Sequence, residues 1–164
     1  MVNIAKFFLE FTSSESCGQC APCRIGLHRM LDILERITNG NGAMPDIDRL
    51  KRLSKTIIDT SFCGLGKTAP NPVLSTLKYF ENEYREHIEE KKCRAKVCTD
   101  LITYRIEEDA CRACGICAKN CPAGAITGEP GEPPYVIDKE GCIRCGTCLE
   151  VCPFGAVKLE SGVL

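Results

Sequence analysis

The chain has 164 residues, a length that suits one domain of ordinary size or two small ones. Its 21 lysines and arginines nearly cancel its 22 aspartates and glutamates, so the composition does not support nucleic-acid binding through bulk positive charge. Fourteen cysteines are the unusual feature, and a content this high indicates either a disulfide scaffold or a metal protein.

The first residues do not have the pattern of a targeting or membrane segment. The apolar stretch from Ile4 to Phe11 is interrupted by Lys6 and Glu10, and it is shorter than the roughly 18 apolar residues that cross a bilayer. A chain without an export signal and with many cysteines is expected in a reducing cytoplasm, where thiols stay available as metal ligands. We therefore expect no membrane partner and favour metal binding over disulfides.

The first cysteine motif is Cys17-Gly-Gln-Cys20-Ala-Pro-Cys23, and the next cysteine along the chain is Cys63. Three close thiolates, with a fourth that returns after intervening helices, suit a [4Fe-4S] cluster. On spacing alone, zinc and free thiols stay open as alternatives.

Apolar residues at three- and four-residue spacing predict helices through the first ninety residues. One helix opens at Pro22 and stops at Asn39-Gly40, and a second has Asp46 as its N-cap candidate. A third opens at Asn71-Pro72 and runs through Ile88. Three amphipathic helices predict a small helical bundle over residues 1–90, which carries the first cysteine motif.

A basic segment poor in large apolar residues follows the bundle, and it predicts a linker over residues 91–103. Cys93 and Cys98 lie in this segment at a spacing seen for structural zinc pairs, and His87 precedes Cys93 by six residues. We interpret His87, Cys93 and Cys98 as a candidate zinc site that pins a hinge, with a fourth ligand that the sequence does not identify. Unliganded thiols and a disulfide are the alternatives.

The last third of the chain is a repeat with an offset of 31 residues, because residues 104–126 align with residues 135–157. The segments 101–106 and 135–137 are β-prone and occupy matching places in the two copies. One small structural unit is thus present twice. The expected fold class is α+β: a helical bundle, a linker, and a compact ferredoxin-like α+β domain over residues 104–164.

Each copy of the repeat contains C-x2-C-x2-C-x3-C-P, the bacterial ferredoxin pattern, in which the fourth cysteine ligates the other cluster. The pattern predicts one [4Fe-4S] cluster on Cys111, Cys114, Cys117 and Cys152, and another on Cys142, Cys145, Cys148 and Cys121. Zinc fits less well, because structural zinc sites favour cysteine pairs separated by a longer gap. Residues 104–159 resemble the two-cluster [4Fe-4S] ferredoxins.

The string from Glu15 to Gly26, followed by Cys63-Gly-Leu-Gly66 and Ala69-Pro-Asn-Pro72, closely resembles a known cluster domain. It is that of the NADH-oxidising flavoprotein subunit of respiratory complex I, which also occurs in NAD-linked formate dehydrogenases and in the flavin subunit of soluble [FeFe]-hydrogenases. The resemblance implies that Cys17, Cys20, Cys23 and Cys63 hold a [4Fe-4S] cluster that takes electrons from FMN.

The continuation into a two-cluster module resembles the flavoprotein β-subunit of electron-bifurcating and NADP-reducing [FeFe]-hydrogenases, in its C-terminal part. Related subunits carry a similar H-x5-C-x4-C pattern, which supports the zinc interpretation. The resemblance implies FMN and NAD(P) on upstream sequence, since no G-x-G-x-x-G turn is present here, so we expect a fragment of a longer chain. The implied partners are a hydrogenase catalytic subunit, a small [2Fe-2S] subunit and soluble ferredoxin.

The chain is therefore predicted to be an electron-transfer module of an oxidoreductase, with no catalytic site of its own. Residues 107–164 contain nine acidic and five basic side chains, which implies a basic neighbour. The alternative is an autonomous ferredoxin-like carrier with an accessory structural domain. A metal-responsive regulator is disfavoured, because neither a recognition helix nor a basic stripe is visible.

Overall fold

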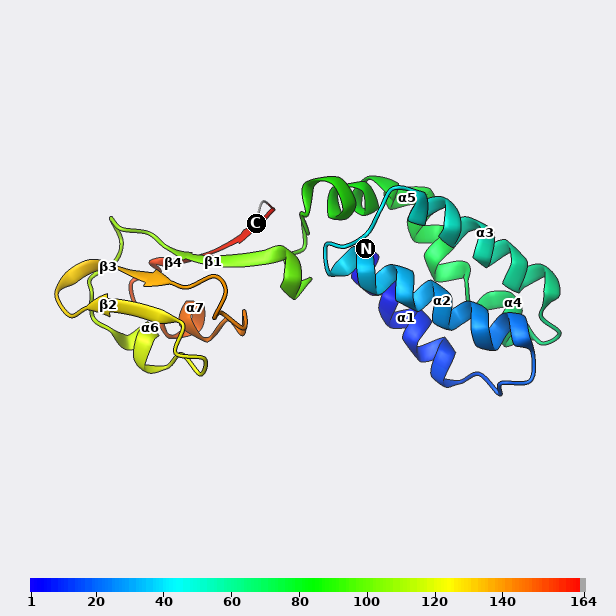
Figure 1. Ribbon diagram of the computed structural model, residues 1–164, viewed down its shortest axis with the longest axis horizontal. Coiled ribbons are helices and arrows are strands. Elements are labelled where there is room, and N and C mark those ends of the chain that lie inside the picture. Colours follow the sequence, from blue (N-terminus) through cyan, green and yellow to red (C-terminus); the bar gives the residue numbers. More distant parts are fainter. Residues whose placement is uncertain (163–164) are drawn as a thin grey trace. The chain divides into compact units, whose positions relative to one another are not determined.

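The computed structural model describes residues 1–162, and it divides them into two compact units, Met1–Leu101 and Ile102–Gly162 (Figure 1). The division lies near the end of the segment 91–103, for which the sequence predicts a linker, so that most of this segment belongs to the first unit. Within the described residues, no helix is long and apolar enough to cross a membrane. The mixture of helices and small sheets agrees with the expected combination of both element types.

The first unit is helical. Its elements are α1 (Val2–Ser14), α2 (Ala21–Thr38), α3 (Pro45–Thr60), α4 (Gly64–Thr68), α5 (Asn71–Arg85), the π-helical turn η1 (Glu86–Glu90) and the 3-10 turn η2 (Thr99–Leu101). The three predicted helices correspond to α2, α3 and α5, and they are confirmed. The N-cap prediction for the second is wrong, because Met44 occupies that position and Asp46 lies in the first turn.

Helix α1 was not predicted, although its buried residues Val2, Ala5 and Leu9 follow helical spacing. It packs against α2 and α5, while α3 also packs against α2 and α5, so the four longer helices enclose one core. The largest fully buried side chains of this core include Leu27, Met30, Leu34, Leu50 and Tyr84. A bundle of this kind gives the short segments at its ends a rigid support.

The end of α5 departs from regular helical geometry. Phe80 has φ −135° and ψ 31°, and the last turn, η1, is π-helical. Lys91 then adopts the left-handed conformation with φ 52°, which ends the helix. Single π-turns of this kind are found frequently at functional sites, and His87 lies in this one.

The second unit contains two antiparallel two-stranded sheets and two short helices. Its elements are β1 (Ile102–Ile106), α6 (Ile116–Lys119), β2 (Ile126–Glu129), β3 (Glu132–Ile137), α7 (Thr147–Val151) and β4 (Val157–Ser161). Strand β1 pairs with β4 in the register Ile106↔Val157, and β2 pairs with β3 in the register Ile126↔Ile137. The two β-prone segments of the repeat are confirmed as β1 and β3.

The two copies of the repeat contact each other through a pair of tyrosines. Gly115 and Gly146 precede α6 and α7, with φ 71° and 85°, a conformation that favours glycine. A Cβ atom on Gly115 would lie 2.9 Å from the hydroxyl of Tyr135, and one on Gly146 would lie 3.0 Å from the hydroxyl of Tyr104. Each tyrosine thus packs on the glycine of the other copy.

Candidate metal centres

The first cysteine motif and Cys63 meet at one end of the bundle. Cys20 is the N-cap residue of α2, Cys23 lies in the first turn of that helix, and Cys63 is the N-cap residue of α4. Cys17 belongs to the loop that joins α1 to α2. The four cysteines line one cavity of about 100 Å³, together with Glu15, Ser16 and Leu65. The structure therefore brings together the four residues predicted from the sequence.

The cavity is open to solvent on one side, because Cys17 and Cys63 are exposed whereas Cys23 is buried. Phe62, the neighbour of Cys63, has 90 % of its surface exposed. A hydrogen bond from the backbone N–H of Gly66 lowers the pKa of the Cys63 thiol. This cysteine therefore loses its proton more readily than an ordinary cysteine does. A thiolate is the form that ligates iron.

Two serines lie next to the cavity, and neither was singled out from the sequence. The hydroxyl of Ser16 is 3.4 Å from Sγ of Cys23. The hydroxyl oxygen of Ser61 is buried, and it has no hydrogen-bond partner among the described residues. A Cβ atom on Gly66 would lie 2.6 Å from this oxygen and 3.5 Å from Cβ of Cys23, which places Ser61 beside the cysteine cavity. A buried hydroxyl without a partner suits a site that takes up a hydrogen-bond acceptor.

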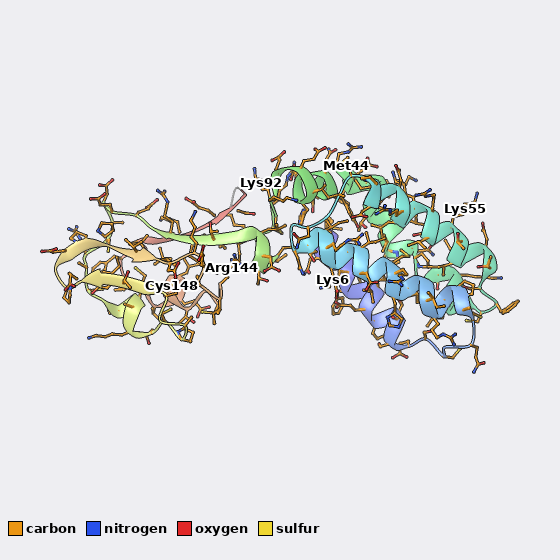
Figure 2. All side chains as sticks on the ribbon, in the orientation of Figure 1. Lys6, Met44, Lys55, Lys92, Arg144 and Cys148 are labelled. Carbon is orange, nitrogen blue, oxygen red and sulfur yellow. The ribbon has the colours of Figure 1, made fainter. Side chains whose placement is uncertain are left out.

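The second unit has two further cavities, each lined by four cysteines. One contains Cys111, Cys114, Cys117 and Cys152. The other contains Cys121, Cys142, Cys145 and Cys148. Each cavity thus combines three cysteines of one copy of the repeat with the fourth cysteine of the other copy, as the sequence pattern predicts. Cys148, which is labelled in Figure 2, lies on α7.

The environments of these thiols differ within each cavity. Burial raises the pKa of Cys117 and of Cys148, which are the innermost cysteines of their motifs. The hydroxyl of Thr147 lies 3.3 Å from Sγ of Cys145 and lowers the pKa of this exposed thiol. Partial burial raises the pKa of Cys152, but hydrogen bonds from the backbone N–H groups of residues 154–157 outweigh this effect. The net result is a lowered pKa. Hydrogen bonds to sulfur are a principal means of tuning iron-sulfur centres.

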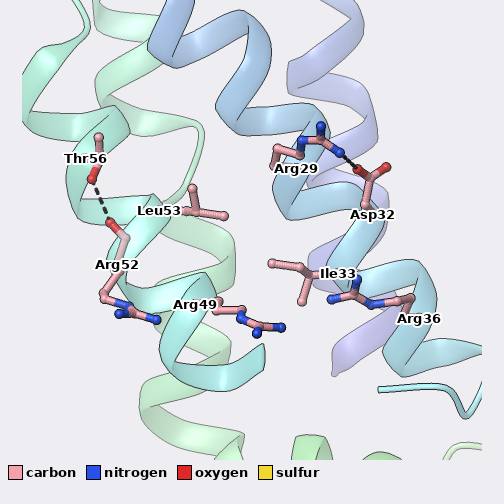
Figure 3. Close-up of a pocket in the computed structure, with 8 residues that line it drawn as sticks. All are labelled: Arg29, Asp32, Ile33, Arg36, Arg49, Arg52, Leu53 and Thr56. Atoms are coloured by element: carbon pink, nitrogen blue, oxygen red, sulfur yellow. Dashed lines mark hydrogen bonds and ion pairs between the residues drawn. The ribbon is translucent and has the colours of Figure 1, made fainter. Parts of the chain in front are cut away.

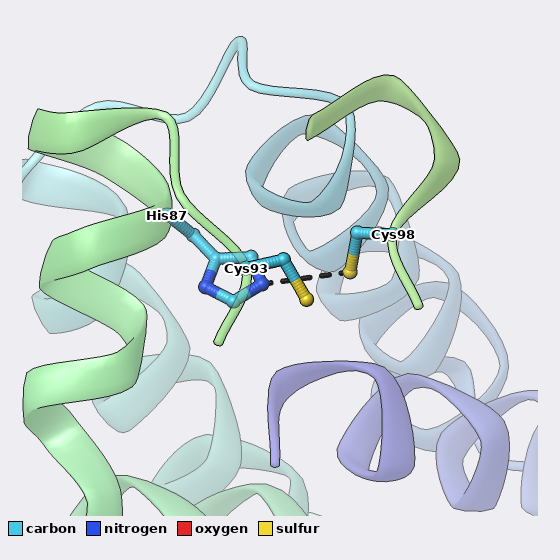
Figure 4. Close-up of side chains that lie close together, drawn as sticks. All are labelled: His87, Cys93 and Cys98. Carbon is cyan, nitrogen blue, oxygen red and sulfur yellow. Dashed lines mark hydrogen bonds between the residues drawn. The ribbon is translucent and has the colours of Figure 1, made fainter. Parts of the chain in front are cut away.

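His87, Cys93 and Cys98 form a fourth cluster, which is buried in the first unit (Figure 4). Their ligand atoms all lie within 4.8 Å of one another, and Nε2 of His87 is 3.5 Å from Sγ of Cys98. Neither Cys93 nor Cys98 forms a disulfide in the structure. Burial raises the pKa of the Cys98 thiol to about 12 and lowers the pKa of His87.

The hydrogen bonds of His87 orient its ring for a ligand. Nδ1 lies 2.6 Å from the backbone carbonyl of Glu83, which can only accept a hydrogen bond, so Nδ1 carries the proton. Nε2 is then unprotonated and faces the two cysteines. Metal-binding histidines have this arrangement, in which a carbonyl holds the far nitrogen. The donor set of one imidazole and two thiols suits zinc.

Comparison with known families identifies an iron-sulfur-binding region in each unit. A profile described as the NADH-ubiquinone oxidoreductase-F iron-sulfur binding region matches residues 3–87, which is more than half of the chain. The chain belongs to this iron-sulfur-binding family. A second profile, described as a 4Fe-4S dicluster domain, matches residues 110–156. Each unit of this family member thus carries a region of a known [4Fe-4S]-binding type, and the resemblance seen in the sequence is confirmed.

Several curated relatives are much longer than this family member. NADP-reducing hydrogenase subunit HndC of Solidesulfovibrio fructosivorans is 54% identical over 133 residues, which are 81% of this chain and 27% of the relative. An NADH-quinone oxidoreductase subunit of Streptomyces coelicolor is 45% identical over 93 residues, which are 57% of this chain and 21% of the relative. The chain therefore spans about a quarter of the length of these relatives.

A solved structure supports the fold. The crystal structure of an NAD+-reducing [NiFe]-hydrogenase in the H2-reduced state aligns with a TM-score of 0.52 and 24% identity, over 82% of this chain and 21% of that chain. The likeness concerns the fold alone.

Proposed function

We propose that the chain carries the iron-sulfur centres of an NAD(P)H-linked oxidoreductase subunit and conducts electrons between a flavin site on a longer protein and a hydrogenase partner. The observation that carries this proposal is the grouping of the cysteines. Twelve of the fourteen line three separate cavities, four in each, and every cavity takes three of them from one compact motif and the fourth from elsewhere. Four thiolates in this arrangement are the donor set of a [4Fe-4S] cluster.

The first centre is assigned to the helical unit. We assign its ligands as Cys17, Cys20, Cys23 and Cys63. The cluster supplies one-electron transfer when bound, and the chain's residues hold it and set its environment. Cys17 and Cys63 lie on the exposed side of the cavity, next to the exposed Phe62. This side is suited to meet an electron donor, because electron transfer between proteins needs short distances and a surface from which water can be excluded.

The second and third centres are assigned to the other unit, with the fourth cysteines exchanged between the two copies of the repeat. The ligands of one are Cys111, Cys114, Cys117 and Cys152, and those of the other are Cys142, Cys145, Cys148 and Cys121. Tyr135 lines the first of these cavities and Tyr104 lines the second, so each cavity has one tyrosine ring in its wall. The rings limit the access of water, which helps to set the reduction potential.

A structural zinc ion is the fourth part of the proposal, with His87, Cys93 and Cys98 as ligands. The burial of all three side chains and the orientation of His87 by the carbonyl of Glu83 support it. Arg94 forms an ion pair with Glu86 of η1 and ties the same segment to the bundle. A zinc ion at this place would fix residues 93–98 to the end of the bundle, with the fourth ligand supplied from outside this cluster.

The cofactors and partners of the whole protein belong to the same proposal. HndC is an NADP-reducing hydrogenase subunit, and another relative is the subunit beta of an NADP(+)-dependent formate dehydrogenase from Moorella thermoacetica, 35% identical over 83 residues. These names support NAD(P) as a cofactor of the whole protein and a hydrogenase catalytic subunit as a partner. The resemblance noted in the sequence adds FMN on further sequence, and a small [2Fe-2S] subunit and ferredoxin as further partners. The proposed location is a reducing cytoplasm, where fourteen cysteines would stay available as metal ligands.

Elemental analysis of anaerobically purified protein tests these assignments together. Three cubanes and one structural ion require about twelve irons and about one zinc per chain. Reduction by dithionite should give electron paramagnetic resonance signals of three [4Fe-4S]+ centres. About eight irons with additional zinc would leave the first unit without a cluster and refute its role in accepting electrons from flavin. A native 18.0 kDa monomer with all twelve irons would point to an autonomous carrier in place of the subunit.

A further inference from the structure

A large groove lies between α2 and α3, away from all of the cysteine cavities (Figure 3). It has a volume of about 440 Å³. Four of its eight lining residues are arginines. The lining consists of Arg29, Asp32, Ile33 and Arg36 from α2, and Arg49, Arg52, Leu53 and Thr56 from α3. Figure 3 shows Ile33 and Leu53 directed toward each other across the groove, so its centre is apolar and its edges are basic.

A buried carboxylate holds two of the arginines in place. Asp46 is 1 % exposed, and its Oδ1 accepts hydrogen bonds from Nη2 of Arg36 at 2.9 Å and from Nη1 of Arg49 at 3.0 Å. Its Oδ2 accepts the backbone N–H of Ala43 at 3.0 Å, which fixes the carboxylate itself. Arg36 and Arg49 keep about half of their side-chain surface exposed, so their remaining N–H groups are available at fixed positions.

The positive charge of the groove is only partly neutralised. Arg29 pairs with Asp32 at 3.2 Å, in a contact that is exposed on both sides. Arg52 makes no ion pair within the part of the chain that the structure describes, and its side chain is exposed. Four guanidinium groups against two carboxylates leave a formal charge of about +2 on one face of the bundle.

The spacing of the arginines argues for an extended anionic ligand. Arg29 and Arg36 are seven residues apart on α2, a separation of about 10 Å at 1.5 Å per residue. A single phosphate or carboxylate cannot reach both ends of such a groove. Arginines that flank apolar side chains are typical of protein interfaces, in which the guanidinium groups bind carboxylates and the apolar residues exclude water.

We propose that this groove is a docking site for an acidic segment of a partner subunit. The segment places an apolar side chain between Ile33 and Leu53, and carboxylates on either side of it bind the arginines of α2 and α3. The inference rests on the proposed function, because it takes the chain to be part of a multisubunit complex. It concerns assembly, whereas the cysteine cavities concern electron transfer.

A zero-length cross-link tests the identity of the ligand. The variant R52K, in the complex isolated from native cells, is treated with a water-soluble carbodiimide, which joins lysine amines to carboxylates in contact with them. Lys51 lies 2.9 Å from Glu81 and provides an internal positive control. Lys55, an exposed lysine of α3 outside the groove, provides the comparison (Figure 2). We expect the lysine introduced at position 52, and not Lys55, to cross-link to an aspartate or glutamate of another subunit.

Charge reversal at the rim gives a second, quantitative readout. Arg29 and Arg52 do not bind Asp46, so R29E/R52E leaves the buried carboxylate with both of its partners. We expect this variant to bind the partner subunit at least tenfold more weakly, with a reduced dependence on salt, and K55E to bind as the parent does. Iron content should be unchanged in both variants.

The outcomes separate the inference from the proposed function. Cross-links confined to this chain's own polypeptide, or unchanged assembly of R29E/R52E, would overturn the docking site while the metal content still supports electron transfer. Binding of inorganic pyrophosphate to the parent but not to R29E/R52E would identify a small-anion site and would also overturn it. A native protein without any partner subunit would contradict both proposals.

Discussion

The hydroxyl oxygen of Ser16 lies 3.4 Å from Sγ of Cys23, and it accepts the backbone N–H of Gly18 at 3.3 Å. The hydrogen bond from Gly18 occupies one lone pair of the serine oxygen, so the hydroxyl proton is still available as a donor. When Cys23 is a thiolate, its sulfur can only accept, so Ser16 donates to it. The loop before α2 therefore supplies a hydrogen bond to one of the proposed cluster ligands.

Replacing Ser16 by alanine should lower the reduction potential of the first cluster. A hydrogen bond to a ligand sulfur stabilises the reduced cluster, which carries more negative charge, more than the oxidised one. A net contribution of about 0.5–1.5 kcal/mol corresponds to about 20–60 mV for a one-electron couple. A redox titration monitored by paramagnetic resonance measures the shift. Ser14→Ala is the control, because the Ser14 hydroxyl bonds to the carbonyl of Phe11 in its own helix; an equal shift in both variants would refute the role of Ser16.

Gly66→Ala should damage the first cavity, whereas Gly64→Ala should not. A Cβ atom on Gly66 would lie 2.5 Å from Cβ of Ser61, but one on Gly64 would meet nothing within 4 Å. Overpacking of this kind costs about 1–3 kcal/mol. We expect the Gly66 variant to lose thermal stability and up to about four irons per chain, the content of one cubane. Full iron in both variants would show that the ligands tolerate movement of Ser61.

The exchange of the fourth cysteines can be tested by pairs of substitutions. If Cys117 and Cys152 serve the same cluster, the double variant C117A/C152A should lose no more iron than C117A alone, and about eight irons should remain. The pair C117A/C121A should then lose two clusters and retain about four irons. Iron analysis and Mössbauer spectra distinguish the two cases, and the opposite order would mean that each copy of the repeat binds its own cluster.

His87→Ala should remove the zinc ion and loosen residues 91–101. A single lost ligand typically weakens a site of three protein ligands severely, and the neighbouring Cys93 and Cys98 would then be left as buried thiols. Zinc content and hydrogen exchange in this segment provide the measurement. The matched control is His28→Ala, since His28 is the other histidine of the chain and is exposed on α2. Equal zinc in both variants would exclude His87 as a ligand.

The zinc affinity should fall as the pH is lowered. Burial raises the pKa of the metal-free Cys98 thiol to about 12, so this thiol is protonated at neutral pH and must release its proton when zinc binds. The apparent affinity therefore decreases by at least about tenfold for each unit of pH decrease. Burial lowers the pKa of His87 from its ordinary value of 6.5, so protonation of the ring adds little above that pH. Competition with a chromophoric chelator at about pH 6.5, 7.5 and 8.5 measures the slope, and a flat profile would argue against thiolate ligation.

The cysteine groups and most of the helices could be predicted from the sequence because both have strong periodic signals. Repeated C-x2-C spacing indicates which thiols lie close together, and Leu27, Met30 and Leu34 mark the buried face of α2. Helix α1 escaped prediction because its outer face also carries large apolar residues, such as Phe7 and Phe11, which obscure the periodicity.

The details around the sites depend on tertiary contacts that have no local signal. Ser16 and Ser61 resemble ordinary loop serines until the folding of α2 and α4 brings them to the cysteines. Asp46 looks like a helix N-cap in the sequence, but in the structure it is buried between Arg36 and Arg49. The sequence alone does not show that Arg36, on the preceding helix, pairs with Asp46, because this ion pair depends on the packing of α2 on α3.

The crossed arrangement of cysteines in the second unit makes its two halves mutually dependent. Neither copy of the repeat possesses four cysteines around one cavity, because each contributes its last cysteine to its sister. A single copy on its own would be incomplete, and it could acquire a full set only by pairing with a second identical molecule. Joining both copies in one polypeptide turns that bimolecular encounter into an intramolecular one, so maturation of the two proposed centres does not depend on protein concentration.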